Sequence, residues 1–180
     1  MRIFTTQTYK ETELIEGCKK NDAKMQQALY YQFYRKMYGV CLRYANDKDE
    51  AVDILQDGFI QVFKYIQDFR GGSLEGWIRR IMVNMAIAHY RKKMKFSTTD
   101  IDNASDAGFD EDSVSSMTCE EILKYIQALP TGYKTIFNLY EIEGYSHVEI
   151  AEMLGISVGT SKSQLSRAKE ILRKQLTVNS

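Results

Sequence analysis

Apolar residues recur every three or four positions along much of this chain, and the pattern is strictest just before its middle. Between positions 52 and 69 the spacing is 3, 4, 3, 4 and 3. A repeat of that period places apolar side chains on one side of an α-helix, so this stretch predicts an amphipathic helix at about 48–68. The apolar side comprises Val52, Leu55, Phe59, Val62, Ile66 and Phe69.

The same period predicts seven further helices. They lie at about 11–18, 22–45, 74–94, 120–129, 133–143, 146–154 and 158–176. The 180 residues include a single proline, Pro130, which suits the first turn of a helix and leaves the others uninterrupted. The sequence therefore predicts an all-α protein.

A polar stretch without helical period separates two groups of helices. Residues 96–117 are rich in Ser, Thr, Asp and Gly, a composition typical of linkers. We therefore expect two small helical domains joined by a flexible acidic linker. The expected bounds are 1–95, 96–117 and 118–180, and residues 1–21 carry little recognisable signal.

The net charge of zero hides an uneven distribution. Residues 1–95 hold 17 basic and 11 acidic side chains, residues 96–123 hold 8 acidic and no basic ones, and residues 124–180 hold 7 basic and 5 acidic ones. Such asymmetry points toward nucleic acid as a partner. No apolar run approaches the ~20 residues that span a bilayer, and the N-terminus lacks a signal peptide's apolar stretch. We expect a cytoplasmic protein without membrane insertion.

The cysteines indicate neither a disulfide framework nor a metal site. Cys18, Cys41 and Cys119 lie far apart, and only His89 and His147 could join them as soft ligands. A zinc site needs about four ligands at short spacings, so we expect cysteines packed as small hydrophobes and no metal or other cofactor. The chain also has no Gly-rich phosphate loop and no HExxH, so no catalytic residues are expected.

The C-terminal helices have the layout of a helix-turn-helix. Ser146 and Glu149 stand at capping-box spacing, Gly155 supplies a tight helix end, and a new helix begins three residues later. The second helix of this motif enters the major groove of DNA. Small hydroxyls allow close approach, and Arg167 can bind a guanine edge through two hydrogen bonds. The candidate DNA-reading residues are Thr160, Lys162, Ser163, Ser166 and Arg167.

The helix at 74–94 carries basic and amide residues beside its apolar side. The apolar side comprises Trp77, Ile78, Ile81, Met85 and Ala88. The opposite face comprises Arg79, Val83, Ala86 and Tyr90, and one flank comprises Arg80, Asn84, Ile87 and Arg91. Cationic side chains there suit phosphate contacts, and Asn84 suits a base edge.

The helix at 48–68 has an unusual face opposite its apolar side. This face comprises Asp53, Ile54, Asp57, Ile60, Gln61 and Lys64. Aspartates among exposed isoleucines fit docking to a basic, partly apolar partner helix. An ordinary solvated surface with stray apolar residues is the alternative.

Three stretches in this order resemble the extracytoplasmic-function sigma factors, the short two-domain initiation subunits of bacterial RNA polymerase. DILQDGFIQVF at 53–63 is similar to the family's polymerase-docking helix, and FRGGSLEGWIRRIMVN, at the start of 69–93, to its promoter-melting segment. Residues 129–172 are similar to its reader of the upstream promoter element. One departure is Ser161, because the family often has valine there. It lies on the helix side formed by Val158, Ser161, Leu165, Ala168 and Leu172.

The resemblance implies a sigma factor that directs promoter-specific transcription initiation and has no catalytic site of its own. Its partners would be promoter DNA, the clamp coiled coil of the polymerase's largest subunit, the flap of the second-largest subunit and an anti-sigma factor. It would read the minus-thirty-five element as duplex. It would also melt and capture the minus-ten element, with the loop at 69–76 holding a flipped base.

The resemblance also assigns residues to these surfaces. The docking residues would be Asp53, Gln56, Asp57, Ile60 and Phe63. The minus-ten and melting residues would be Phe69, Arg70, Gly71, Gly72, Ser73, Trp77, Arg79, Arg80, Asn84, Ile87, Arg91 and Lys92. The acidic linker would thread a basic channel of the polymerase, or else act only as a tether.

Two other functions stay open from the residues alone. A helix-turn-helix transcription regulator with an unrelated N-terminal sensor domain would bind duplex DNA without polymerase. A metal-dependent nuclease using the linker carboxylates would show metal-dependent cleavage.

Overall fold

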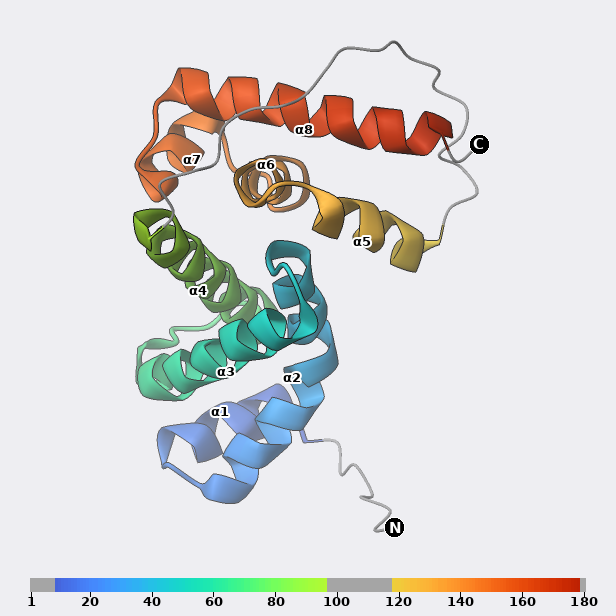
Figure 1. Cartoon of the computed structure of the whole chain (residues 1–180). Coiled ribbons are helices and arrows are strands. Elements are labelled where there is room, and N and C mark those ends of the chain that lie inside the picture. The colour runs from blue at the N-terminus through green and yellow to red at the C-terminus, as the bar shows by residue number, and fades with distance from the viewer. Residues whose placement is uncertain (1–8, 97–117, 179–180) are drawn as a thin grey trace.

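The computed structural model describes residues 9–96 and 118–178, and in these ranges it contains helices and no strands (Figure 1). The predicted all-α class is confirmed. The N-terminal helices are α1 (Glu11–Lys19), α2 (Ala23–Tyr44), α3 (Lys48–Tyr65), the 3₁₀ turn η1 (Ile66–Asp68) and α4 (Leu74–Phe96). The C-terminal helices are α5 (Cys119–Ala128), α6 (Thr131–Phe137), the π-helical turn η3 (Asn138–Ile142), α7 (His147–Leu154) and α8 (Val158–Val178). Most of the linker lies outside the described residues.

The N-terminal helices form one bundle, in which α2, α3 and α4 pack against one another and α1 packs on α2. Aspartates start two of these helices. Asp22 accepts hydrogen bonds from the backbone N–H groups at the start of α2, and Asp47 accepts one at the start of α3, which satisfies donors that a helix start leaves free. α3 packs on α4 at Gly58, where any side chain would overlap the Met82 side chain.

The C-terminal helices contain the predicted helix-turn-helix, formed by α7 and α8. Ser146 and Glu149 make the capping box at the start of α7, and Gly155 ends that helix in the left-handed conformation with φ 69°. Ser157 begins α8, since its Oγ accepts a hydrogen bond from the Thr160 N–H at 2.9 Å. α6 packs across α8.

The predicted helix at 133–143 is divided by the π-helical turn. The N–H of Glu143 donates to the carbonyl of Asn138 at 3.0 Å, which is the five-residue spacing of a π-helix. The buried side chain of Asn138 donates to the carbonyls of Lys134, at 2.9 Å, and of Arg43 in α2, at 2.8 Å. This turn therefore directs polar groups of the C-terminal half toward the N-terminal bundle.

The two halves also share apolar packing. α2 contacts α5 and α6, and α4 contacts α6 and α7, as Figure 1 shows where α4 ends beside α7. One continuous apolar cluster includes residues of both halves, among them Val83 and Ile87 of α4 and Ile136, Leu139 and Leu154 of the C-terminal half. We use the term closed form for this arrangement, in which α6 and α7 lie against α2 and α4.

Several predicted helix faces are wrong because these helices have neighbours on more than one side. Ile54, predicted as exposed, is buried, since α3 packs between α2 and α4. Val83 and Ala86, predicted opposite the core, are buried, since α4 also meets the C-terminal half. Ala88, predicted in the core, is exposed.

Val158, also predicted in the core, is 37% exposed as the first residue of α8. No helix in the described ranges has the length and apolar character to cross a membrane.

Candidate nucleic-acid interface

The loop before α4 depends on two glycines. Gly71 and Gly72 have φ of 112° and 87°, a backbone region that other residues adopt only with strain. Ser73 then begins α4, because its Oγ accepts the N–H of Gly76 at 3.0 Å. Nothing lies within 4 Å of the position a Cβ would take at either glycine. The loop is therefore open to solvent on that side.

Two aromatic residues, Phe69 and Trp77, pack against each other beside this loop. Phe69 is buried, and its ring meets the half-buried ring of Trp77 edge to face, with centroids 5.5 Å apart. The carbonyl of Phe69 accepts a hydrogen bond from Lys19 at 3.1 Å. The structure thus places both aromatics in packing, while Arg70 and Ser73 are exposed.

The flank of α4 is partly exposed and partly buried. Arg80, Asn84 and Lys92 are exposed, so their side chains are accessible to a nucleic acid. Ile87 is only 4% exposed and belongs to the core, so the prediction of a surface contact there is wrong. The isoleucine lies on the side of α4 that its neighbouring helices cover.

Two predicted DNA-binding arginines of α4 contact the C-terminal half. Arg79 donates from Nε and from a terminal nitrogen to the two carboxylate oxygens of Glu143, both at 2.8 Å. This hydrogen bonding is the main cause that raises the pKa of Arg79 above its ordinary value. Arg91 donates to the carbonyl of Met153 in α7.

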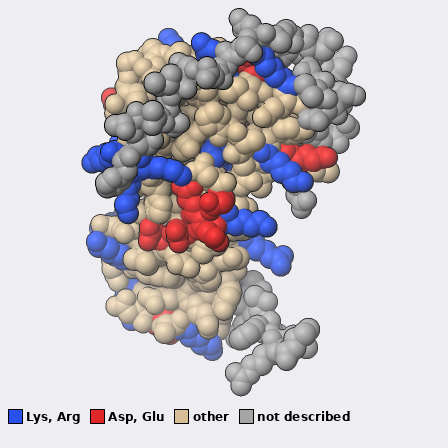
Figure 2. Space-filling view, viewed as in Figure 1, with Lys and Arg blue, Asp and Glu red and all other residues tan. Residues whose placement is uncertain are grey.

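The outer face of α3 carries the predicted docking residues. Asp53 and Gln56 are exposed, and the Ile60 side chain is 61% exposed. Phe63 is half-buried and stacks on Phe59 with centroids 6.2 Å apart. Figure 2 shows acidic side chains gathered over α3, with basic side chains beside them at the end of α4. This face combines negative charge with an exposed isoleucine, as the sequence predicts.

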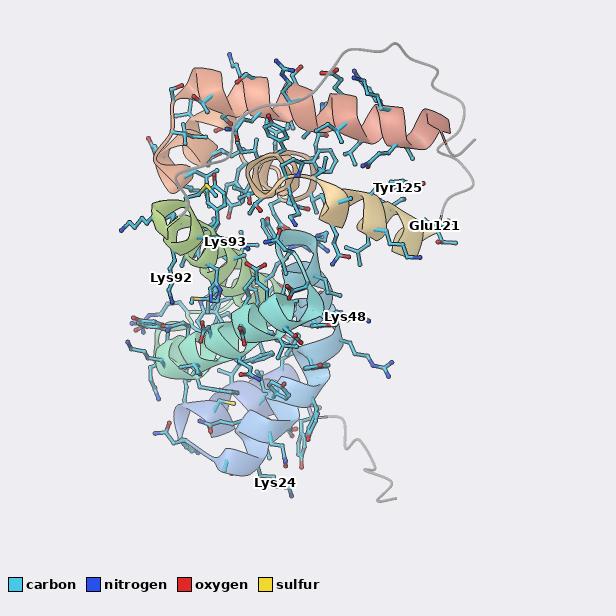
Figure 3. All side chains as sticks on the ribbon, in the orientation of Figure 1. Lys24, Lys48, Lys92, Lys93, Glu121 and Tyr125 are labelled. Carbon is cyan, nitrogen blue, oxygen red and sulfur yellow. The ribbon has the colours of Figure 1, made fainter. Side chains whose placement is uncertain are left out.

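Asp57 has a partner that the sequence did not indicate. Its carboxylate is 2.8 Å from Nε2 of His89 in α4, and its side chain is 49% exposed. Close by, Lys93 lies 3.6 Å from Glu50, and Figure 3 shows Lys92 and Lys93 together on α4. No local pattern links residues 32 positions apart, so only the fold reveals this pairing.

The polar face of α8 has the exposure that DNA reading requires. Lys162, Ser163, Ser166 and Arg167 are exposed, and the half-buried Thr160 is held by Ser157 through hydroxyls 2.8 Å apart. Side chains on such a face can reach base edges and phosphates without repacking.

Ser161 is completely buried where α8 meets α7. Its Oγ is 2.9 Å from Nδ1 of His147, the first residue of α7, and the His147 ring stacks on Tyr140 with centroids 4.4 Å apart. The buried hydroxyl of Ser161 therefore has a hydrogen-bond partner. At this position α7 and α8 are joined by a hydrogen bond instead of an apolar contact.

No metal site is formed by the described residues: no three His, Cys, Asp or Glu side chains there could hold an ion. Cys18 and Cys41 are buried free thiols. Burial raises the pKa of Cys18 to about 11 and that of Cys41 to about 12, so both stay protonated and unreactive at neutral pH.

Comparison with known proteins accounts for both halves. Residues 29–96 match the sigma-70 region 2 family, and residues 119–172 match the sigma-70 region 4 family. The ECF RNA polymerase sigma factor SigW of Bacillus subtilis is 32% identical over 90% of this chain and 94% of its own length. This chain belongs to the extracytoplasmic-function sigma factors. It is thus an RNA polymerase sigma factor for promoter-specific transcription initiation.

Further relatives support the assignment to the sigma factors. The RNA polymerase sigma-H factor of Pseudomonas aeruginosa is 28% identical over 92% of this chain and 93% of its own length. The sigma factor RpoE of Bartonella quintana, solved in complex with the anti-sigma factor NepR, has the same fold with a TM-score of 0.51. It is 20% identical, and the match covers 86% of this chain and 98% of that one. The alternative of a regulator with an unrelated N-terminal domain is wrong, because residues 29–96 match region 2.

Proposed function

We propose that this sigma factor uses three surfaces in initiation: α3 for docking to the polymerase core, the 69–76 loop with α4 for the minus-ten element, and α8 for the minus-thirty-five element. The observation that carries the proposal is the position of Arg80 and Asn84. Both are exposed on α4, directly after a loop kept open by two glycines.

Docking would rest on charge and apolar contact together. Asp53, Asp57 and the exposed Ile60 present a mixed face on α3. A basic, partly apolar helix such as the clamp coiled coil of the largest subunit complements such a face. The partner of region 4 would be the flap of the second-largest subunit.

Capture of the minus-ten element would use the open loop. Flipping a base out of the duplex costs a few kcal/mol in lost stacking and pairing. Contacts of the loop backbone at Gly71 and Gly72, with Asn84 and Arg80 on the adjoining helix, would offset that cost on a separated strand. Sequence choice and strand opening would then be one event.

Reading of the minus-thirty-five element would use the exposed face of α8 in the major groove. Arg167 is the candidate for a guanine edge, while Lys162 is placed for phosphate contact. Phosphate contacts fix register, and base contacts carry the sequence preference.

The three surfaces would lie on two domains joined by an acidic linker. The domains run from 1 to 95 and from 118 to 180, and the acidic segment at 96–117 joins them. The chain has no catalytic site of its own, acts in the cytoplasm and binds an anti-sigma factor. The solved relative in complex with NepR supports the last of these.

Transcription from a randomised promoter library, with core polymerase and with or without this protein, tests the proposal. We expect start sites that appear only with the protein and share two sequence elements. Asn84→Ala should reduce these transcripts, while Gln27→Ala, which changes an exposed residue of α2 outside the three surfaces, should not. Absence of protein-dependent start sites would refute the proposed function.

A further inference from the structure

Glu143 lies between two arginines of the N-terminal bundle. Its carboxylate accepts two hydrogen bonds from Arg79, each of 2.8 Å, and one from Arg43 of α2 at 3.3 Å. The Glu143 side chain is only 8% exposed. Paired hydrogen bonds between an arginine and two charged oxygens are the geometry that arginine uses for carboxylates and for phosphates.

Two further donors lie at this site without a partner among the described residues. They are Nε of Arg43 and the hydroxyl of Tyr44, both buried. Burial, and then the nearby Glu143 carboxylate, raise the pKa of Tyr44, so the hydroxyl keeps its proton. Buried donors are normally satisfied, so the site offers more hydrogen bonds than Glu143 accepts.

Beside the shared apolar cluster, polar contacts hold the two halves together around this site. The buried ammonium of Lys134 donates to the carbonyl of Ala45 at 3.0 Å and to Oδ1 of Asn46 at 2.8 Å. Gln127 donates to the carbonyl of Leu42 at 3.0 Å. Polar contacts of this kind can be exchanged for water or for another partner at lower cost than apolar ones.

In the closed form, the C-terminal half therefore engages two arginines of the region that would bind the minus-ten element in hydrogen bonds. Arg79 donates hydrogen bonds to Glu143, and Arg91 donates one to the carbonyl of Met153. Arg80, Asn84 and Lys92 remain exposed on α4, together with the loop. A DNA strand along α4 would have to displace Glu143 to reach Arg79.

We propose that Arg43, Tyr44 and Arg79 form a binding site for a backbone phosphate of promoter DNA, and that Glu143 occupies this site in the closed form. Like a carboxylate, a phosphate diester presents two charged oxygens to an arginine, and it can also accept from the Tyr44 hydroxyl. The DNA strand and Glu143 then compete for one site, so the free protein binds DNA weakly until the halves separate. This inference rests on the proposed function of α4.

The test uses the full-length protein and a short fluorescein-labelled single-stranded oligonucleotide. Affinity is measured by anisotropy over a range of salt concentrations, and separation of the halves by small-angle X-ray scattering. Glu143→Gln should increase the radius of gyration. It should also raise DNA affinity on the order of tenfold, because apparent affinity scales with the fraction of binding-competent molecules.

Two companion variants separate the phosphate site from simple loosening of the protein. Arg79→Gln breaks the same ion pair, so it should also increase the radius of gyration, but without the gain in affinity. Tyr44→Phe removes a donor that Glu143 does not use. It should leave the closed form intact and, combined with Glu143→Gln, should lower the gain in affinity.

Glu152→Gln is the matched control, because Glu152 is an exposed glutamate of α7 and its loss changes the net charge equally. Circular dichroism checks that every variant keeps its helix content. Equal affinity gains from Glu143→Gln and Arg79→Gln would overturn the phosphate site, and an unchanged radius of gyration in both would overturn the competition. Promoter-dependent transcription by the wild-type protein with core polymerase reports on the proposed function separately.

Discussion

Raising the pH from 7 to 9 should stabilise this sigma factor through Lys134. Its side chain is completely buried between the two halves, and its ammonium donates to the carbonyls of Ala45 and Gln127 and to Asn46. Burial lowers the pKa of Lys134 from 10.5 to about 8, and the nearby Glu50 opposes that shift. The folded protein therefore releases this proton at a lower pH than the unfolded chain does.

The sign and size of the effect follow from the difference between these two pKa values. Between about pH 8 and 10.5 the unfolded chain holds the proton and the folded protein does not, so the free energy of unfolding rises with pH. The contribution of Lys134 from pH 7 to pH 9 is about 1 kcal/mol. The thiols of Cys18 and Cys41, whose pKa values burial raises, act in the opposite direction above about pH 8. For a chain of this length, about 1 kcal/mol from Lys134 corresponds to a change in Tm of about 2 to 4 °C.

Thermal unfolding of wild type and Lys134→Met at pH 7, 8 and 9 measures this contribution. The variant should have a lower Tm at every pH, because three acceptors lose their donor, and its difference in Tm from wild type should grow as the pH rises. Lys124→Met, which changes an exposed lysine of α5, should keep the wild-type dependence of Tm on pH. If the difference between Lys134→Met and wild type does not grow with pH, the buried ammonium does not make this contribution.

Four further predictions concern the proposed surfaces. Asp57→Arg should weaken binding to core polymerase in a titration, because a cation would face a basic partner. Arg167→Ala should cost ~1–3 kcal/mol at one base pair and relax the preference there, as measured on a panel of upstream-element variants. Replacing Gly71–Ser73 with bulkier residues should impair open-complex formation on duplex promoters, by permanganate reactivity, with partial rescue on pre-melted ones, which need no unpairing. Ser161→Val should lower stability by about 1 kcal/mol in chemical denaturation, because His147 loses its partner.

Three of these predictions have a matched control, and each of the four has a contrary outcome. Glu16→Arg changes an exposed acid of α1, and an equal effect there would argue against the docking face. Lys162→Ala should weaken all promoter sequences alike, and the same behaviour in Arg167→Ala would exclude base reading. Lys92→Ala should lose affinity on both duplex and pre-melted templates. If the loop variant is impaired equally on both templates, the loop is only a structural connection and does not capture a flipped base. A valine at 161 that raises stability would show that packing outweighs the hydrogen bond.

The bounds of the helices were predictable because their signals are local. The capping residues Ser146 and Glu149, the left-handed Gly155 and the apolar repeat of α3 each act within a few residues of chain. The predicted exposure of the polar face of α8 follows from the same periodicity. Such signals report which side of a helix is apolar, and here they located the helix-turn-helix.

The positions of Ile87, Lys134 and Asn138 were not predictable in this way. Periodicity identifies one apolar side, but α4 has neighbours on several sides, which is why Ile87 is buried. Lys134 and Asn138 interact with backbone carbonyls 89 and 95 residues away. A carbonyl is present at every residue, so the sequence gives no sign of which ones these side chains meet.

The Met82 side chain of α4 packs directly on Gly58 of α3, and this contact couples the two helices. A side chain at position 58 would overlap the Met82 thioether, so the glycine sets how closely α3 and α4 pack. In the proposed complex with polymerase, the crossing of α3 and α4 would then set the distance from the clamp to the first opened base. The site of strand opening would move only if the clamp itself moved.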